Sequence, residues 1–340
     1  MKNDNLKLKK TFLIFFFVIY IFSLLIFNLS EANAQQVSLT ISPPLLELFI
    51  KPGKSVLIAY NLENLGDPAI LSTKVLPFVP QGNQGGIKIK EEFAGPIRFY
   101  LDNANLKLDD PFFLKTKDSQ QLLLRIRVPE GTPNGDYYYT LLTETKHSKG
   151  TEGTTSSLAK ATIGANILIT VTESGQVDIK GKVAFFDVTS RYKLKLFGQI
   201  FNFIESTDKV PVVLILENQG KNLIKPQGEI DLLGNFGERA KFEILPQNIL
   251  AESQRLTQAT PSAEIDCNNN RKEQACLFPT SLVLSGFFLG KYRLSTSINF
   301  GEGTPNIFAY VTFYAMPLKF ILAILSSITI VVFIVKRVRE

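Results

Sequence analysis

The chain has 340 residues and a formal net charge of +6, and it contains one His, two Cys and no Trp. So few His and Cys side chains exclude the usual imidazole and thiolate metal sites, and the sequence has no His-Glu-x-x-His, Gly-x-Ser-x-Gly or P-loop pattern. The composition therefore predicts no catalytic, cofactor-binding or metal-binding residues, and hence not an enzyme.

The positive charge is concentrated at the two ends of the chain. Residues 1–34 hold four Lys against two acidic residues, and residues 336–340 hold three cations against one acidic residue. The remaining 30 cations and 28 acids give the segment 35–335 a net charge of only +2. A body so nearly balanced does not predict nucleic acid as a partner.

Residues 1–34 have the pattern of a secretory signal peptide. Basic residues precede a long apolar stretch at 11–30, which is followed by Ala32-Asn33-Ala34. A basic head, an apolar middle and an Ala-x-Ala end predict export from the cytoplasm and cleavage after Ala34. Because the apolar stretch is long for a signal peptide, an uncleaved N-terminal anchor is the alternative.

The body of the chain reads as β-structure throughout. Apolar and polar residues alternate at 55–63, 121–128 and 291–298, which predicts strands with one face over a core. Turn signals rich in Gly, Pro and Asn separate such runs, and no long amphipathic helical pattern occurs between them. The sequence therefore predicts an all-β fold of Ig-like β-sandwiches rather than a parallel α/β sheet.

Two short motifs occur twice in the same order. The sequence LENLG at Leu62–Gly66 is followed by LENQG at Leu216–Gly220, an offset of 154 residues. Gly135-Asp136-Tyr137 is followed by Gly290-Lys291-Tyr292, an offset of 155 residues. Matching offsets predict one sandwich type used twice in tandem.

The repeat places domain 1 at 35–174 and domain 2 at 175–316. In each Asn-x-Gly we expect the Asn side chain to bond its own turn and the Gly to adopt a positive φ. In each Gly-x-Tyr we expect the Tyr ring to fill the core and its hydroxyl to reach a loop backbone, as in a tyrosine corner. These residues are thus interpreted as markers of the fold and not as a ligand site.

Candidate contact residues lie where the two copies differ. The Cys267–Cys276 loop is predicted to carry a local disulfide between Cys267 and Cys276, because thiols outside the cytoplasm tend to oxidise. The hairpin tip near His147 and the segment 79–97 are further candidate surfaces. The sequence leaves open whether 79–97 is a binding loop or a strand pair. Tyr138 is expected on the face opposite to Tyr137 and Tyr139, where a surface contact is open to it.

The C-terminal region has the pattern of a transmembrane helix at 317–335. Residues 320–335 are uncharged and the basic tail 336–340 follows at once. By the positive-inside rule this tail is cytoplasmic. The prediction is a single-pass protein of the cell membrane, with its body outside the cytoplasm; a buried core helix is the alternative.

The motifs carry a family resemblance. LTISPPLLELFIKPGKSVLIAYNLENLGDPA with LKTKDSQQLLLRIRVPEGTPNGDYYYTLL resembles bacterial Ig-like domains of the periplasmic-chaperone and NEW3-like kind, and VPVVLILENQGKNLIKPQGEIDLLGNFG with FFLGKYRLS is similar to a second one. The whole layout resembles the WxL-interacting proteins. That resemblance implies a first domain that binds peptidoglycan and a second that binds a surface partner, but no binding residue of the family maps onto this sequence.

The leading functional hypothesis is a non-catalytic envelope protein that binds an extracytoplasmic protein or a cell-wall polymer, for adhesion, assembly or scaffolding. One alternative is a pilus-type chaperone that acts by β-strand addition. Another is an accessory subunit of a membrane complex, in which the helix does more than anchor. A hydrolase acting through carboxylates alone is the least favoured.

Overall fold

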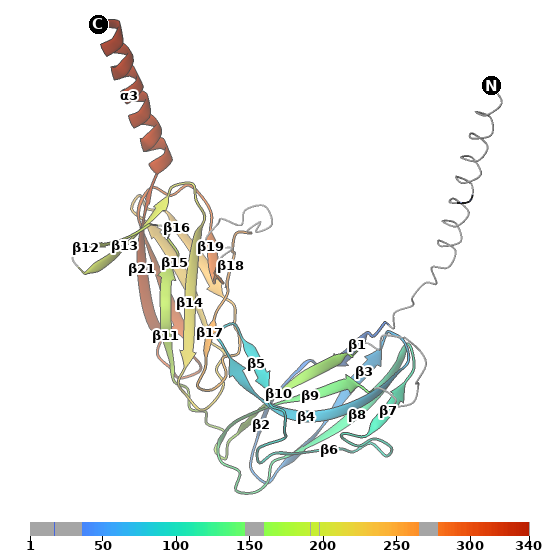
Figure 1. The fold of residues 1–340 in the computed structure, drawn as a ribbon. Coiled ribbons are helices and arrows are strands. Elements are labelled where there is room, and N and C mark those ends of the chain that lie inside the picture. Colours follow the sequence, from blue (N-terminus) through green and yellow to red (C-terminus); the bar gives the residue numbers. More distant parts are fainter. Residues whose placement is uncertain are drawn as a thin grey trace, which may run out of the picture.

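The structure, a computed structural model, describes residues 17, 36–146, 160–190, 192–196, 198–264 and 278–339. It shows two β-sandwiches in tandem, followed by one helix at the C-terminal end, α3 (Leu318–Arg339) (Figure 1). This confirms the predicted fold class. The domain bounds themselves stay a prediction.

The first sandwich packs a four-stranded sheet, in the order β1-β3-β8-β6, against a six-stranded sheet. The second sheet has the order β2-β10-β9-β4-β5, and β7 pairs with β4 beside that path. The strands are β1 (Leu39–Ser42), β2 (Leu45–Ile50), β3 (Ser55–Asn64), β4 (Ala69–Gln81), β5 (Gly86–Ile89), β6 (Arg98–Leu101), β7 (Pro111–Leu114), β8 (Asp118–Arg127), β9 (Gly135–Thr145) and β10 (Thr162–Val171).

The second sandwich packs a sheet of order β11-β14-β17, with β19 also paired to β14, against a seven-stranded sheet. The larger sheet has the order β12-β13-β21-β20-β15-β16-β18. The strands are β11 (Gly181–Val188), β12 (Tyr192–Leu196), β13 (Gln199–Glu205), β14 (Val210–Asn218), β15 (Gln227–Gly234), β16 (Arg239–Ile244), β17 (Gln254–Leu256), β18 (Ala259–Thr260), β19 (Leu282–Leu284), β20 (Gly290–Asn299) and β21 (Ile307–Met316).

The two sandwiches share one topology. Strand β1 pairs antiparallel with β3, and β11 pairs antiparallel with β14. The chain then crosses to the other sheet, where β2 runs parallel to β10 and β13 runs parallel to β21. In each sandwich the two last strands form an antiparallel pair, β9 with β10 and β20 with β21. The repeated sequence motifs therefore mark equivalent places in one fold.

Each sandwich has a hydrophobic core of its own. Alternate residues of β3 and β8, such as Tyr60, Leu122 and Leu124, are buried in the first core. Leu214 and Leu294 take the same role in the second core. Two separate cores mean that each sandwich buries enough apolar surface to hold its own sheets together.

The repeated Asn residues close the turn after an early strand. The buried Asn218 side chain donates from Nδ2 to the carbonyl oxygens of Asn222 (2.8 Å), Ile249 (3.0 Å) and Leu250 (3.1 Å). Its Oδ1 accepts the Gly220 N–H at 2.9 Å. Asn64 makes the equivalent bonds, including one from the Gly66 N–H at 3.0 Å. One amide thus satisfies several backbone groups at the rim of each core.

The expected role of the two glycines is wrong. Neither Gly66 nor Gly220 has a positive φ. Instead, a Cβ on Gly66 would lie 2.3 Å from the Gln36 carbonyl oxygen, and one on Gly220 would lie 2.1 Å from that of Asp178. The chain entering each sandwich passes against the turn, so close backbone approach is the reason for glycine at both places.

The Gly-x-Tyr motifs take the expected roles, but the two tyrosine side chains are buried to different extents. Gly135 and Gly290 have positive φ values of 145° and 89° and begin β9 and β20. Tyr137 is half-buried and donates its hydroxyl proton to the Pro133 carbonyl oxygen at 3.0 Å. Tyr292 is fully buried, and its hydroxyl accepts the Leu289 N–H at 3.2 Å. Both hydroxyls reach a nearby loop backbone.

Helix α3 leaves the end of the second sandwich directly after β21, with Pro317 between them (Figure 1). Its segment Leu318–Arg337 has a mean hydropathy of 2.7, and none of it is buried against the rest of the protein. Ser326, Ser327 and Thr329 bond carbonyl oxygens of the preceding turn. By length and composition α3 is able to cross a membrane.

Replacing Asn218 with Ala should destabilise the second sandwich, because three carbonyl oxygens and one N–H each lose one hydrogen bond to its side-chain amide. We expect Asn218→Ala to lower the free energy of unfolding by about 3 kcal/mol. Urea unfolding of the segment 35–316 measures it. The control is Asn103→Ala, because Asn103 is only half-buried but also bonds the backbone of Gln121 and Leu123. Equal losses for the two variants would contradict this role for Asn218.

Candidate functional site

His147, Cys267 and Cys276 lie outside the described residues, as does the proposed signal peptide apart from Phe17. The candidate segment 79–97 is described throughout, and it is a strand pair with a loop after it. Strands β4 and β5 pair from Phe78↔Ile89 to Gln81↔Gly86.

The tip of this hairpin contacts the second sandwich. The Leu256 N–H donates to the Asn83 carbonyl oxygen at 2.6 Å. A Cβ on Gly85, whose φ is 79°, would lie 2.8 Å from the Arg255 guanidinium carbon. The tip of the β4–β5 hairpin therefore joins the two sandwiches.

The strongest contact between the sandwiches is built around the carboxylate of Asp136. From the first sandwich, Asp136 accepts the hydroxyl proton of Thr170 at 2.8 Å and that of Tyr138 at 2.8 Å. From the second, it accepts Asn222 Nδ2–H at 2.9 Å and the Leu223 N–H. Four donors on one carboxylate make a strong link, because hydrogen bonds to a charged acceptor exceed neutral ones.

Tyr138 completes the junction. Its ring stacks on Phe78 with centroids 5.8 Å apart, and its hydroxyl accepts the Ala251 N–H at 2.8 Å. Burial and the neighbouring Asp136 carboxylate raise the pKa of the Tyr138 hydroxyl. The surface contact that the sequence left open for Tyr138 is thus made to the second sandwich of the same chain.

A cleft of about 370 Å³ lies beside this junction. Strands β2 and β10 line one wall through Leu45, Glu47 and Leu168, and Asn248 and Arg255 line the other. Asn248 donates to Glu47 across the cleft. The Arg255 guanidinium donates to the Asn248 carbonyl oxygen at 2.7 Å, and burial lowers its pKa. The Asn248–Glu47 bond thus links the two walls of the cleft, and Arg255 holds the backbone of Asn248 on its own wall.

The Asp136 link should fix the angle between the sandwiches. Asp136→Asn turns one acceptor atom into a donor that faces other donors, so we expect the two sandwiches to move relative to each other. Spin labels on each sandwich should then give a clearly broader distance distribution. Asp118→Asn, an exposed site on β8, is the control. An unchanged distribution in Asp136→Asn would contradict the assignment.

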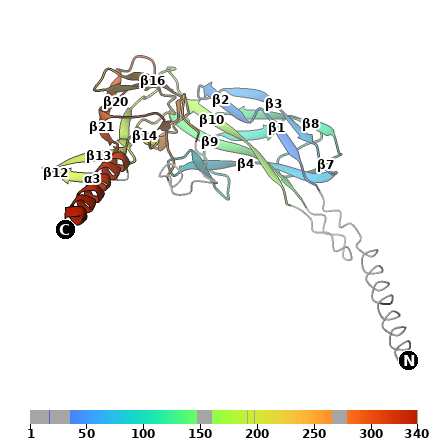
Figure 2. The same cartoon turned by 90° about the horizontal axis from the view of Figure 1, so that it is seen from above.

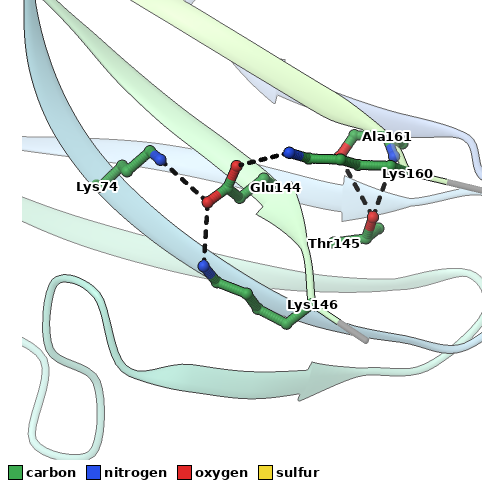
Figure 3. Close-up of polar contacts among 6 residues, drawn as sticks. All are labelled: Lys74, Glu144, Thr145, Lys146, Lys160 and Ala161. Carbon is green, nitrogen blue, oxygen red and sulfur yellow. Dashed lines mark hydrogen bonds and ion pairs between the residues drawn. The ribbon is translucent and has the colours of Figure 1, made fainter. Parts of the chain in front are cut away.

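A cluster of one carboxylate and three lysines lies on the six-stranded sheet of the first sandwich. Glu144 is 8% exposed and accepts from Lys74 Nζ at 3.0 Å and Lys146 Nζ at 3.1 Å, with Lys160 Nζ at 3.9 Å (Figure 3). The hydrogen bond from Lys74 is the main reason that the pKa of Glu144 lies below its ordinary value. The three lysines neutralise the buried Glu144 carboxylate and leave a local excess of positive charge.

The Glu144 cluster predicts a defined pH dependence. Since the folded-state pKa lies below the ordinary 4.5, the stabilisation is present above that value and is lost as the pH falls through the folded-state pKa. We expect Glu144→Gln to reduce the unfolding free energy by about 1–2 kcal/mol at pH 7. The difference should shrink as the pH falls below 4.5 and through the folded-state pKa of Glu144. Urea unfolding over a series of pH values from 7 downwards measures it, and a pH-independent difference would contradict the cluster's role.

The second sandwich contains an inserted strand that the first lacks. Two residues connect β1 to β2, whereas the ten residues between β11 and β13 include β12. The hairpin of β12 and β13 projects sideways from the sandwich in both views (Figures 1 and 2). Sequence reasoning missed this hairpin, although the alternation in YKLKL before Gly198 is a strand signal.

A polar network sets which face of β12 points outward. Lys193 Nζ donates to Asp187 Oδ2 at 3.0 Å, and Asn202 Nδ2 donates to Asp187 Oδ1 at 3.1 Å. The Ser190 hydroxyl bonds Asn202 Oδ1 at 2.9 Å. Because side chains alternate along a strand, this contact leaves Tyr192, Leu194 and Leu196 on the opposite face.

That opposite face is apolar and aromatic across three strands. Leu194 pairs with Phe201, and Phe203 follows two residues later on β13. The rings of Phe201 and Phe203 lie 5.8 Å and 5.7 Å from that of Tyr314 on β21. Leu194 is 50% exposed and Tyr310 is 68% exposed. We call this surface, formed by Tyr192, Leu194, Leu196, Phe201, Phe203, Tyr310 and Tyr314, the aromatic face.

The surfaces described above present hydrogen-bonding groups and exposed apolar side chains. Among the described residues, no group of three or more His, Cys, Asp or Glu side chains is arranged to hold a metal ion. The junction carboxylate Asp136 is occupied by donors of the chain itself. The aromatic face offers apolar area and a strand edge.

No family model and no curated protein matches the chain. Among solved structures, the class 5 fimbriae chaperone CfaA is 12% identical, with 82% of this chain and 100% of that chain covered and a TM-score of 0.37. The E. coli chaperone DraB is 12% identical, with 82% and 98% covered and a TM-score of 0.34. The CsuC–CsuE chaperone–tip adhesion subunit complex of Acinetobacter baumannii is 11% identical, with 82% of this chain and 99% of that chain covered and a TM-score of 0.33. Similarity this remote says nothing about what the present chain binds.

Proposed function

We propose that this chain is a non-catalytic, membrane-anchored extracytoplasmic protein that binds a protein partner along β12 of its second sandwich. The observation that carries the proposal is the aromatic face at an edge strand. Within the described residues, β12 ends the order of its sheet, and all five of its residues are exposed.

An edge strand is a template for another strand. Its outward backbone groups can pair with an extended segment of a partner, while pockets and apolar side chains beside it select that segment. Proteins usually protect such edges with Pro, bulges or charges. On β12 one lysine, Lys193, is held by Asp187, so Lys195 is the remaining charge on the strand.

The aromatic face favours a protein over a polymer. A row of Leu, Phe and Tyr side chains beside a strand suits an apolar strand of a partner, because aromatic residues dominate the centres of protein interfaces. The resemblance to WxL-interacting proteins supports the same assignment, since their second domain is thought to bind a surface partner. Membership of that family is part of the proposal.

The anchor is the second part of the proposal. Helix α3 would cross the membrane, and Lys336 and Arg337 at its far end would hold the tail in the cytoplasm. The two sandwiches would then stand outside, with β12 close to the membrane surface and open to the side.

The test is recovery of a partner from envelope extract by the tagged segment 35–316. We expect a discrete protein whose recovery falls at least tenfold, equivalent to about 1.4 kcal/mol, with Leu194→Asp. The matched control is Leu57→Asp, because Leu57 is 45% exposed on a strand of the other sandwich and Leu194 is 50% exposed. Equal recovery with Leu194→Asp, or recovery of cell-wall polymer alone, would contradict the proposal.

Replacing 320–335 by an unrelated apolar helix separates the proposal from the accessory-subunit alternative. Binding along β12 predicts that the full chain with the replaced helix keeps its partner. Loss of the complex on this replacement, with folded sandwiches, would assign the recognition to α3 instead.

A further inference from the structure

The end of the second sandwich nearest α3 exposes large apolar side chains from two loops. Phe236, in the turn between β15 and β16, is 72% exposed, and Phe287, before β20, is 66% exposed. Leu289 and Met316 are also exposed. We propose that this end, which we call the seating loops, rests in the outer leaflet of the membrane, so that the second sandwich contacts lipid as well as being tethered to it.

Backbone contacts hold the seating loops around the root of α3. The Asn235 N–H donates to the Lys291 carbonyl oxygen at 3.1 Å, which ties the Phe236 turn to the start of β20. The Phe288 N–H donates to Ser206 O at 2.9 Å, and the Ser206 N–H donates to Met316 O at 3.1 Å. Through these bonds both loops are fixed beside the last residue of β21.

The loop before β20 is built so that its apolar residues point out. Phe288 is buried and packs edge-to-face on Tyr292 and Phe313, with centroid distances of 5.3 Å and 5.9 Å. With Phe288 fixed in the core, its neighbours Phe287 and Leu289 are left exposed to the surroundings. A protein end that faced only water would gain nothing from two large apolar side chains there.

The position of α3 places these loops at membrane depth. The uncharged stretch begins at Phe320, four residues after Met316, so the end of β21 lies about 6 Å above the hydrocarbon region along the helix. The interfacial layer on each side of that region is about 5–7 Å thick. Lys319 stays at the polar boundary, where Nζ lies 3.4 Å from Asp208 Oδ1 and the backbone N–H donates to Glu205.

Interfacial lipid is the medium that suits this surface. Exposed Phe and Leu side chains insert at the boundary between headgroups and acyl chains, and Lys side chains nearby bind the polar layer. This inference rests on α3 as the proposed anchor. If the seating loops rest in the membrane, β21 runs along the membrane normal. The aromatic face then points sideways, parallel to the membrane surface.

The natural absence of Trp allows a direct test. Three full-length variants, each in phosphatidylcholine–phosphatidylglycerol nanodiscs, carry one Trp: Phe287→Trp at the seating loops, Phe333→Trp inside α3, and Phe308→Trp at the far end of β21. Phe308 is 73% exposed, so it matches Phe287 in exposure to solvent. Fluorescence is quenched either by lipids brominated near the headgroup or by acrylamide in the water.

We expect brominated lipid to quench Trp at 287 and at 333 at least threefold more than at 308, and acrylamide to show the reverse order. Phe236→Trp should repeat the result for 287 from the other loop. Quenching at 333 with water-like behaviour at both 287 and 236 would overturn the seating while leaving the anchor intact. Absence of lipid quenching at 333 would overturn the anchor and the seating together.

Discussion

The arrangement of the molecule depends on the carboxylate of Asp136. It joins two strands of the first sandwich to the loop at Asn222 and Leu223 of the second. The Asn222 carbonyl oxygen is in turn held by Asn218, the repeated Asn of the second copy. Asp136 itself is the middle residue of the first Gly-x-Tyr motif. Two motifs that first mark the fold therefore also meet at the junction, because both lie at the end of a sandwich.

The two copies of the fold differ in the connection that follows their first strand. The first sandwich passes from β1 to β2 in a tight connection, and the second inserts β12 at the same place. This insertion adds a projecting edge strand with an apolar face to the larger sheet of the second sandwich. The polar network around Asp187 keeps that face outward. The proposed partner surface and the proposed anchor both belong to the second half of the chain, while the junction determines where the first sandwich projects.

The sequence was sufficient for the architecture because strand alternation and repeated turns are local signals. It predicted that Asn64 and Asn218 bond their own turns. It gave the wrong reason for glycine at position 66, since the close approach of the Gln36 backbone arises only when the chain folds back. It also could not show that Tyr138 meets Ala251, because that contact joins residues 113 positions apart. Strand β12 was missed although YKLKL alternates, because the run is only five residues long.

The proposed function requires a partner strand that lies against β12 in the intact cell envelope. A photo-crosslinking amino acid placed at 194 in the full-length protein tests this in intact cells, with the same amino acid at 57 for comparison. We expect one discrete crosslinked protein from position 194 and none from position 57. Crosslinks of equal yield from both positions, or none from 194 in protein that reaches the membrane folded, would contradict it.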